Sequence, residues 1–290
     1  MEALAFRFYS PELVCVSFRN FGLCATYWEV PIKLQLHGKT ALVCAGSKGI
    51  GAAAARQLAS LGCRVMVIAR SQTNLDEVCA SLDGSGHITL QADMNDHKNV
   101  IEKISDRLDE TGPIEIVINN MAGPKGGPLL GADAEEIAHG MHGHVLLAHK
   151  LAQLLVPGMQ ARSYGRIVNI ISTSVKVPIV GLGVSNTVRG AMANWAKTMS
   201  IELAPHGITV NNVLPGFTET ERLESIITAR AAKSGQSEEG VRRDLMNSVP
   251  AGRFGTADEV GSAIAFLASP AAGYINGINL PVDGGRTGCL

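Results

Sequence analysis

The sequence predicts an α/β protein with a doubly wound, Rossmann-type parallel sheet of about seven strands in a single domain. Three observations predict it. Short apolar runs alternate with longer amphipathic stretches along the chain, most of the runs lack polar alternation, and a glycine-rich loop follows the first run. The 290 residues are 46% hydrophobic and 18% charged, which is ample for a large core.

The sequence predicts seven strands, each a short apolar run. They are Thr40–Cys44, Cys63–Ala69, His87–Ala92, Ile114–Asn119, Arg166–Ile171, Thr209–Leu214 and Asn279–Val282. Six of them have no polar alternation, which is typical of parallel strands covered on both faces, whereas His87–Ala92 alternates in part.

Helical patterns fill the gaps between these runs, including Gly51–Leu61, Leu146–Met159 and Met192–Leu203. The sequence Thr256-Ala257-Asp258-Glu259 is a capping box and predicts the start of a helix over Val260–Ala268. This alternation predicts helices on both faces of a parallel sheet, with ligands bound beyond the carboxyl ends of the strands.

The domain itself is predicted to span residues 34–290, because no linker, repeat or compositional break divides this stretch. Residues 1–33 are interpreted as a peripheral extension or a misassigned start. A secretory signal is not expected, since this stretch contains Glu2 and Glu12 and has no continuous apolar segment. Organelle targeting is a weaker alternative, because transit peptides are poor in acidic residues.

The net charge and the residue spacings indicate which kinds of partner to expect. A net charge of −1 does not indicate a surface that binds nucleic acid or an anionic membrane. No apolar run reaches the roughly 20 residues that span a bilayer. Neither the cysteines nor the histidines show a metal-ligand spacing, so we expect no metal and reduced cysteines in a cytoplasmic protein. These residues are Cys15, Cys24, Cys44, Cys63, Cys79, Cys289, His139, His142, His144 and His149.

The glycine-rich loop predicts a dinucleotide site because it lies between a strand and a helix. Its residues are Gly46, Ser47, Lys48, Gly49, Ile50 and Gly51. Its glycines let the backbone approach a pyrophosphate at a helix N-terminus. An acid that would bind the ribose of NAD is missing after the second strand, where Arg70 stands instead. Arg70 and Lys48 suit the 2′-phosphate of NADP(H), although both could be solvated surface charges.

From about Leu34 onward the chain resembles the short-chain dehydrogenase/reductase family, and most closely its 3-oxoacyl-carrier-protein reductases. Gly49-Ile50-Gly51 matches the family's phosphate loop, whereas Cys44 and Ala45 stand in place of its Thr-Gly. The resemblance also carries over cofactor contacts to Asp93, to Asn120 of Asn119-Asn120-Met121-Ala122-Gly123, to Pro215 and Gly216, and to Thr220. The ending Val282-Asp283-Gly284-Gly285 resembles the family's closing segment.

The family's catalytic residues are a Ser, a Tyr thirteen residues later and a Lys four residues beyond it. The Ser position falls on Ser172, but Ser185 replaces the Tyr and Arg189 replaces the Lys. Ser185 is a poor proton donor, and Arg189 binds ribose hydroxyls but does not titrate. Two groups are therefore candidates for the missing donor: Lys176, and His144 at the position of the family's Asn.

The resemblance implies an NADP(H)-dependent oxidoreductase that interconverts a carbonyl, 3-oxoacyl groups included, and an alcohol. It also implies a homodimer or homotetramer. A catalytically inactive NADP(H)-binding sensor or assembly partner is the main alternative. Lyase chemistry of the halohydrin dehalogenase kind is a third hypothesis, which the retained glycine loop disfavours. Residues 221–250 are expected to cover the small-molecule substrate with a mixed apolar and basic surface that suits an acyl chain.

Overall fold

The structure is a computed structural model that describes residues 32–289. The chain divides into two units, Met1–Lys33 and Leu34–Leu290, and the second holds every element described below. The predicted N-terminal extension lies outside the described residues, apart from its last two positions.

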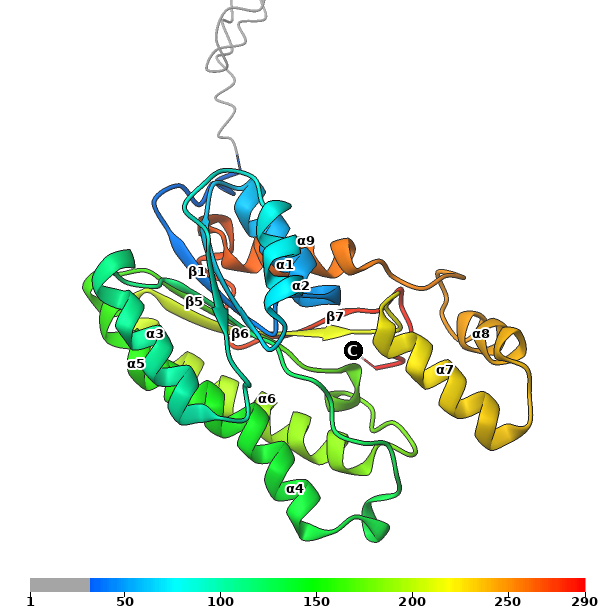
Figure 1. Ribbon diagram of the computed structural model, residues 1–290. Helices are drawn as coiled ribbons and strands as arrows, with labels where there is room; N and C mark the ends of the chain where they lie inside the picture. Colours follow the sequence, from blue (N-terminus) through cyan, green and yellow to red (C-terminus); the bar gives the residue numbers. More distant parts are fainter. Residues whose placement is uncertain (1–31, 290) are drawn as a thin grey trace, which may run out of the picture. The chain divides into compact units, whose positions relative to one another are not determined.

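The second unit is built on one seven-stranded parallel sheet (Figure 1). The strands are β1 (Thr40–Cys44), β2 (Arg64–Ala69), β3 (Ile88–Gln91), β4 (Ile116–Asn119), β5 (Gly165–Ile170), β6 (Ile208–Pro215) and β7 (Asn279–Val282). Their order is β3-β2-β1-β4-β5-β6-β7. The first three strands are added from the middle of the sheet toward one edge, and the last four from β1 toward the other edge, so the strand order reverses between β1 and β4. The doubly wound Rossmann-type prediction is confirmed, and the reversal marks the edge where such sheets bind ligands.

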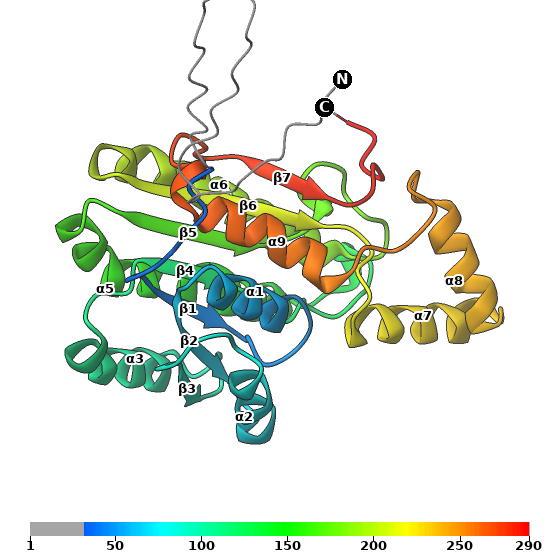
Figure 2. The same cartoon turned by 90° about the horizontal axis from the view of Figure 1, so that it is seen from above.

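Helices cover both faces of this sheet (Figures 1 and 2). They are α1 (Gly49–Ser60), α2 (Gln72–Ala80), α3 (His97–Thr111), α4 (Ala134–Met141), α5 (Leu147–Ala161), α6 (Gly183–Leu203), α7 (Glu221–Ser234), α8 (Glu238–Asn247) and α9 (Ala257–Ala268). α1, α2 and α9 pack on one face and α3, α5 and α6 on the other. The predicted capping box is present at the start of α9, where Thr256 and Glu259 cap each other.

Two elements differ from the sequence prediction. β7 is only partly buried, because it is the last strand of the sheet and helices cover it incompletely. The helix predicted from Met192 begins nine residues earlier, at Gly183. Its first turns carry polar residues, which hid the helical period from a reading based on apolar spacing. β3, whose run alternates in part, lies at the opposite edge of the sheet.

A chain of asparagine side chains crosses four neighbouring strands. Asn119 of β4 donates to Asn169 of β5, Asn169 donates to Asn212 of β6, and Asn212 donates to Asn279 of β7, each at 2.8 Å. Asn169 and Asn212 are buried, and a buried amide without a partner costs about 1–3 kcal/mol. The chain therefore fixes the register of β4 to β7, since a slip of one strand would leave these amides unpaired.

No helix within residues 32–289 is long and apolar enough to cross a membrane.

Candidate functional site

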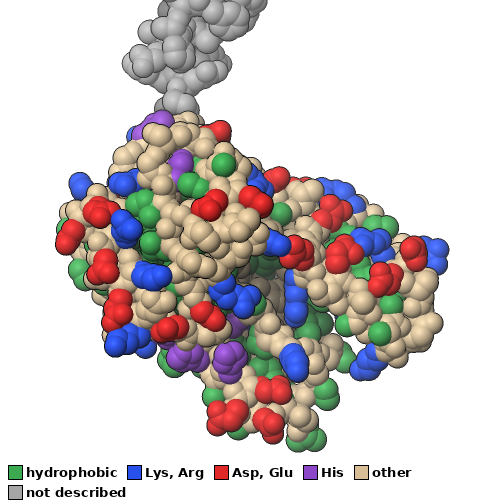
Figure 3. Space-filling view, viewed as in Figure 1, with side chains coloured by type: hydrophobic (Ala, Val, Ile, Leu, Met, Phe, Trp, Pro, Cys, Tyr) green, Lys and Arg blue, Asp and Glu red, His purple; other side chains and the backbone are tan. Residues whose placement is uncertain are grey.

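The predicted site residues lie after the carboxyl ends of the strands. The loops that follow β1, β4, β5 and β6 carry most of them, and these four strands are neighbours in the sheet. The space-filling view has a hollow near its centre, bordered by Lys and Arg side chains (Figure 3). The predicted residues are thus brought to one edge of the sheet by its topology.

The glycine loop has the geometry that a pyrophosphate requires. Gly49 has a φ of +53°, in the left-handed region, and it begins α1. A Cβ at Gly51 would lie 2.6 Å from the carbonyl oxygen of Ala45 and 2.9 Å from Nδ2 of Asn120. Among residues 32–289 no side chain caps the start of α1, which leaves its first N–H groups able to bind an anion. The loop therefore fits the phosphates of a dinucleotide.

The turn that precedes the glycine loop contains a non-glycine residue with a positive φ. Ala45 stands where the family has glycine, and it adopts a φ of +43°, a conformation that costs a non-glycine residue about 1–2 kcal/mol. The next residue, Gly46, is packed tightly, because a Cβ there would lie 2.7 Å from Cγ1 of Val67. The turn is kept, and the strain is carried by Ala45.

Three predicted cofactor residues support the loop or its surroundings. Asn120 donates from Nδ2 to the carbonyl of Ala45 at 3.2 Å, which ties the end of β4 to the loop. Cγ2 of Thr220 lies 3.3 Å from the position of a Cβ on Gly49, so the start of α7 borders the same loop. Asp93 accepts from the backbone and side chain of Asn95 and shapes the turn after β3.

Pro215 ends β6, and Gly216 follows it. Gly216 packs against the C-terminal segment, since a Cβ at this position would lie 2.6 Å from Cβ of Asp283. The segments Leu214–Gly216 and Val282–Gly285, both predicted from the family resemblance, therefore meet beside the site.

The two cations predicted to bind a 2′-phosphate have different surroundings. Arg70 is exposed directly after β2. Lys48 forms a 2.7 Å ion pair with Glu221 of α7, and both side chains are largely exposed. Glu221 raises the pKa of Lys48 through this hydrogen bond and its charge. Lys48 is therefore charged, and its exposed partner Glu221 is one that a phosphate group can displace.

Ser185 and Arg189 lie one turn apart on α6, and both are buried. Nη1 of Arg189 donates to the carbonyl of Ile170 at the end of β5, at 2.7 Å. Nε of Arg189 is buried and has no hydrogen-bond partner within the described part of the chain. Burial, and then the nearby charge of Arg222, lower the pKa of Arg189 to about 10, so it is charged at neutral pH.

Ser172 follows β5 by two residues and is the N-cap of a short 3-10 turn, Thr173–Val175. Its Oγ accepts a hydrogen bond from the backbone N–H of Ser174 at 3.1 Å, which holds the hydroxyl in place. Lys176, the predicted alternative proton donor, ends the same turn and is partly buried.

His144 lies in a π-helical turn, His142–Leu146, that joins α4 to α5 and that the sequence did not predict. Burial, and then the charge of Arg189, lower its pKa to about 3, against a smaller opposing effect of a hydrogen bond with the backbone of Ala122. Its Nε2 is buried without a partner. Because the ring is neutral at pH 7, His144 can offer a neutral N–H or a lone pair, and its role as proton donor stays a prediction.

The neighbouring histidines engage separate partners. His142 stacks on His97 with ring centroids 3.7 Å apart, and Nδ1 of His149 accepts from the indole of Trp195 at 3.4 Å. Within residues 32–289, no group of three or more His, Cys, Asp or Glu side chains is arranged to hold a metal ion.

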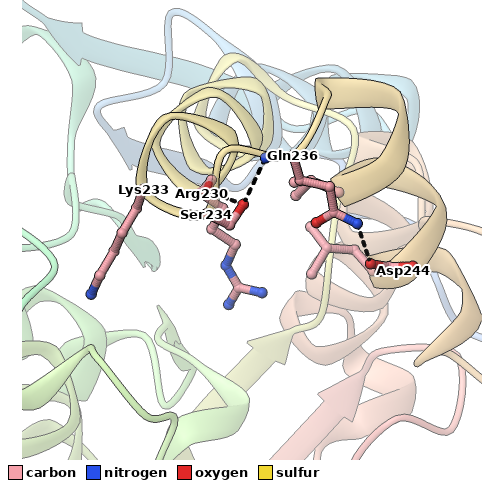
Figure 4. A pocket seen from close by; sticks show the side chains of 7 residues that line it. Arg230, Lys233, Ser234, Gln236 and Asp244 are labelled. Carbon is pink, nitrogen blue, oxygen red and sulfur yellow. Dashed lines mark hydrogen bonds between the residues drawn. The ribbon is translucent and has the colours of Figure 1, made fainter.

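The segment predicted to cover the substrate forms α7 and α8, which share a small apolar cluster of their own. A cavity of about 410 Å³ lies beside these two helices (Figure 4). The side chains of Gln236 and Asp244 are joined across it at 2.8 Å. It is lined by Arg230, Lys233, Ser234, Gln236, Val241, Asp244 and Leu245, none of which is a predicted site residue.

The sequence reasoning missed Arg222 at the start of α7. Its Nη2 donates to the carbonyl of Pro124 at 3.4 Å, which brings α7 against the loop after β4. The signal available in the sequence was a basic residue two positions after Thr220. That signal does not show which loop the side chain reaches.

Comparison with known proteins agrees with this geometry. Residues 44–287 match the family described as enoyl-(acyl carrier protein) reductase. The chain belongs to the short-chain dehydrogenase/reductase family. A tropinone reductase homolog of Arabidopsis thaliana is 34% identical over 256 residues, which cover 87% of this chain and 91% of the relative. The 3-oxoacyl-[acyl-carrier-protein] reductase of Vibrio cholerae is 31% identical over 252 residues, 87% of this chain and 98% of the relative.

Solved structures of the same family share the fold. The L-sorbose reductase of Gluconobacter frateurii, whose crystal structure holds NADPH and L-sorbose, superposes with a TM-score of 0.83 at 26% identity. The match covers 89% of this chain and 100% of the sorbose reductase chain. The chain is thus similar over nearly the whole described unit to reductases of this family.

Proposed function

We propose that this oxidoreductase is NADP(H)-dependent and interconverts a carbonyl and an alcohol with an atypical catalytic set, 3-oxoacyl compounds being the first substrates to test. One observation carries the proposal. Ser185 and Arg189 replace the family's Tyr and Lys, yet both are buried on one face of α6, with Arg189 held to the end of β5 at 2.7 Å. This burial on one face supports a site role for the pair.

NADP(H) is the cofactor, and it supplies the hydride. The glycine loop holds its phosphates, and Lys48 and Arg70 are available to its 2′-phosphate from two sides. The relative from Gluconobacter frateurii binds NADPH in its crystal structure, which supports the same choice here.

The catalytic side chains divide the remaining work. Ser172, whose Oγ is held by the N–H of Ser174, binds the substrate oxygen. Arg189 and Ser185 hold the ribose and the nicotinamide edge. The proton reaches the product oxygen from Lys176 or from ordered water, because Ser185 is too weak an acid and His144 is neutral.

The oligomeric state and the cellular location remain predictions. The proposed homodimer or homotetramer is supported by large exposed apolar side chains such as Leu146 and Ile201. The described cysteines Cys44, Cys63, Cys79 and Cys289 are all free thiols, which fits a reducing, cytoplasmic setting.

The double variant Ser185→Tyr with Arg189→Lys tests the proposal. If the replaced pair only weakens a reductase, restoring a phenol beside an ammonium should raise NADPH-dependent reduction of a 3-oxoacyl thioester by about 10²–10⁴-fold. If the chain has its own proton donor, the double variant should gain little, and Lys176→Ala should abolish the activity of the parent.

Binding of NADPH, followed by fluorescence, is the control for each variant. If NADPH binds tightly while the parent and both variants leave a broad panel of carbonyl compounds unreduced, the enzyme proposal fails and a cofactor-binding sensor replaces it. Absence of NADPH binding would instead favour the lyase hypothesis.

A further inference from the structure

Two arginines from different helices converge on one point beside the catalytic residues. Nη2 of Arg189 and Nη2 of Arg222 each lie 3.7 Å from the position of a Cβ on Gly123, in the loop after β4. Arg189 comes from α6 and Arg222 from α7. A Cβ at Gly123 would be in van der Waals contact with both guanidinium groups, so this loop position faces both charges.

The charges at this point are not balanced by the protein. Among residues 32–289, neither arginine forms an ion pair with a carboxylate. Their hydrogen bonds go to backbone carbonyls, of Ile170 for Arg189 and of Pro124 for Arg222. The charge of Arg222 also disfavours the charged form of Arg189, which places the two groups near each other.

Two buried polar atoms in this region have no hydrogen-bond partner among residues 32–289. They are Nε of Arg189 and Nε2 of His144, whose side chains are more than nine-tenths buried, and the charge of Arg189 acts on His144. An unpaired buried donor costs about 1–3 kcal/mol, and more when the group is charged. Such groups are typical of a site whose partner arrives with a ligand.

We propose that the substrate carries a carboxylate, which binds to Arg222 over Gly123, beside the ribose-binding Arg189. A carboxylate matches a planar guanidinium with two parallel hydrogen bonds and neutralises part of the excess charge. The inference rests on the proposed function in one respect, that the same molecule presents a carbonyl to Ser172. It deepens that function by selecting oxo acids over neutral ketones and esters.

Acetoacetate and its methyl ester are matched probes, because they share the ketone and differ in the carboxylate. Calorimetric titration of the protein loaded with NADP⁺ measures binding alone, since the oxidised cofactor has no hydride to give. The acid should bind at least about tenfold more tightly than the ester, as one lost charge-assisted contact is worth roughly that factor. The advantage should shrink as salt is raised.

Arg222→Gln is the informative variant, because Arg222 is exposed and its replacement leaves the core intact. It should remove most of the advantage of the acid, and Arg222→Lys should retain part of it. Arg230→Gln, an exposed arginine of the same helix that lines the α7–α8 cavity, is the matched control and should leave the advantage unchanged.

Equal affinity for acid and ester in the parent protein would overturn the inference. So would an Arg222→Gln variant that loses NADP⁺ affinity as much as acetoacetate affinity, since Arg222 would then serve the cofactor. Acetoacetate binding that depends on Arg222, without any ketone reduction under NADPH, would leave the carboxylate site standing and refute the reductase. Reduction of neutral ketones alone would refute the carboxylate site and leave the reductase standing.

Discussion

The phosphate loop and the face of α6 that carries Ser185 and Arg189 are constrained in different ways. In the loop the constraint is on the backbone: a Cβ at Gly51 would lie 2.6–2.9 Å from two backbone atoms and the side chain of Asn120. On α6 the constraint is on side chains, since Ser185 and Arg189 are buried and Arg189 donates to the carbonyl of Ile170. The shape of the loop thus depends on the path of the backbone, whereas the properties of the α6 face depend on its side chains.

The largest effect is expected from Gly51→Val in the loop. The new side chain cannot fit without moving the carbonyl of Ala45 and the backbone of Gly46. Affinity for NADPH should fall by more than about 100-fold, and the free energy of unfolding should drop by about 1–3 kcal/mol because of overpacking. Fluorescence titration and urea unfolding measure the two quantities.

Gly190→Ala on α6 is the matched control. A Cβ at Gly190 meets no atom within 4 Å, and this position is exposed inside a helix. Alanine should therefore stabilise the protein by about 0.5–1 kcal/mol and leave NADPH binding unchanged. Equal tolerance of both glycine substitutions would contradict the contrast between the two regions.

A second prediction concerns the catalytic region and pH. The pKa of His144 is about 3 in the folded protein, below its ordinary value of about 6.5. As pH falls below 6.5, the unfolded chain takes up a proton that the folded state refuses, so stability is lost toward acid. His144→Asn should reduce the loss of unfolding free energy between pH 7.5 and pH 4.5 by about 2–3 kcal/mol.

Some acid sensitivity should persist in that variant. Burial, together with the charges of His142 and Lys150, lowers the pKa of His97 to about 4, against the opposing charge of Asp96. Urea unfolding at the two pH values measures the effect. If the free energy of unfolding depends on pH in the same way in the parent and in His144→Asn, folding does not lower the pKa of His144.

The smallest effect is expected at the contact between the phosphate loop and the start of α7. Glu221→Gln removes the exposed partner of Lys48 and frees this lysine for a 2′-phosphate. NADPH should then bind roughly two- to fivefold more tightly, with no change for NADH and with a loss of the gain at high salt.

Arg70→Ala provides the opposite control, since it removes a predicted phosphate contact and should weaken NADPH binding without affecting NADH. If Glu221→Gln weakens NADPH binding instead, Glu221 orders the loop rather than competing for Lys48.

The sequence by itself determined the seven strands, the glycine loop and the capping box of α9. These features depend on local periodicity, on turn chemistry and on motifs within a few residues of each other, so they can be read along the chain. The sequence did not predict that Ser185 and Arg189 lie on a helix, because the predicted helix began only at Met192.

Only the tertiary structure decided which distant groups meet. Lys48 and Glu221 are 173 residues apart in sequence, and Arg222 and Pro124 are 98 apart. The neutral state of His144 likewise follows from its burial beside Arg189, and the exposure of β7 from its place at the end of the sheet. Burial and long-range charge depend on how the elements pack, which the local pattern of residues does not contain.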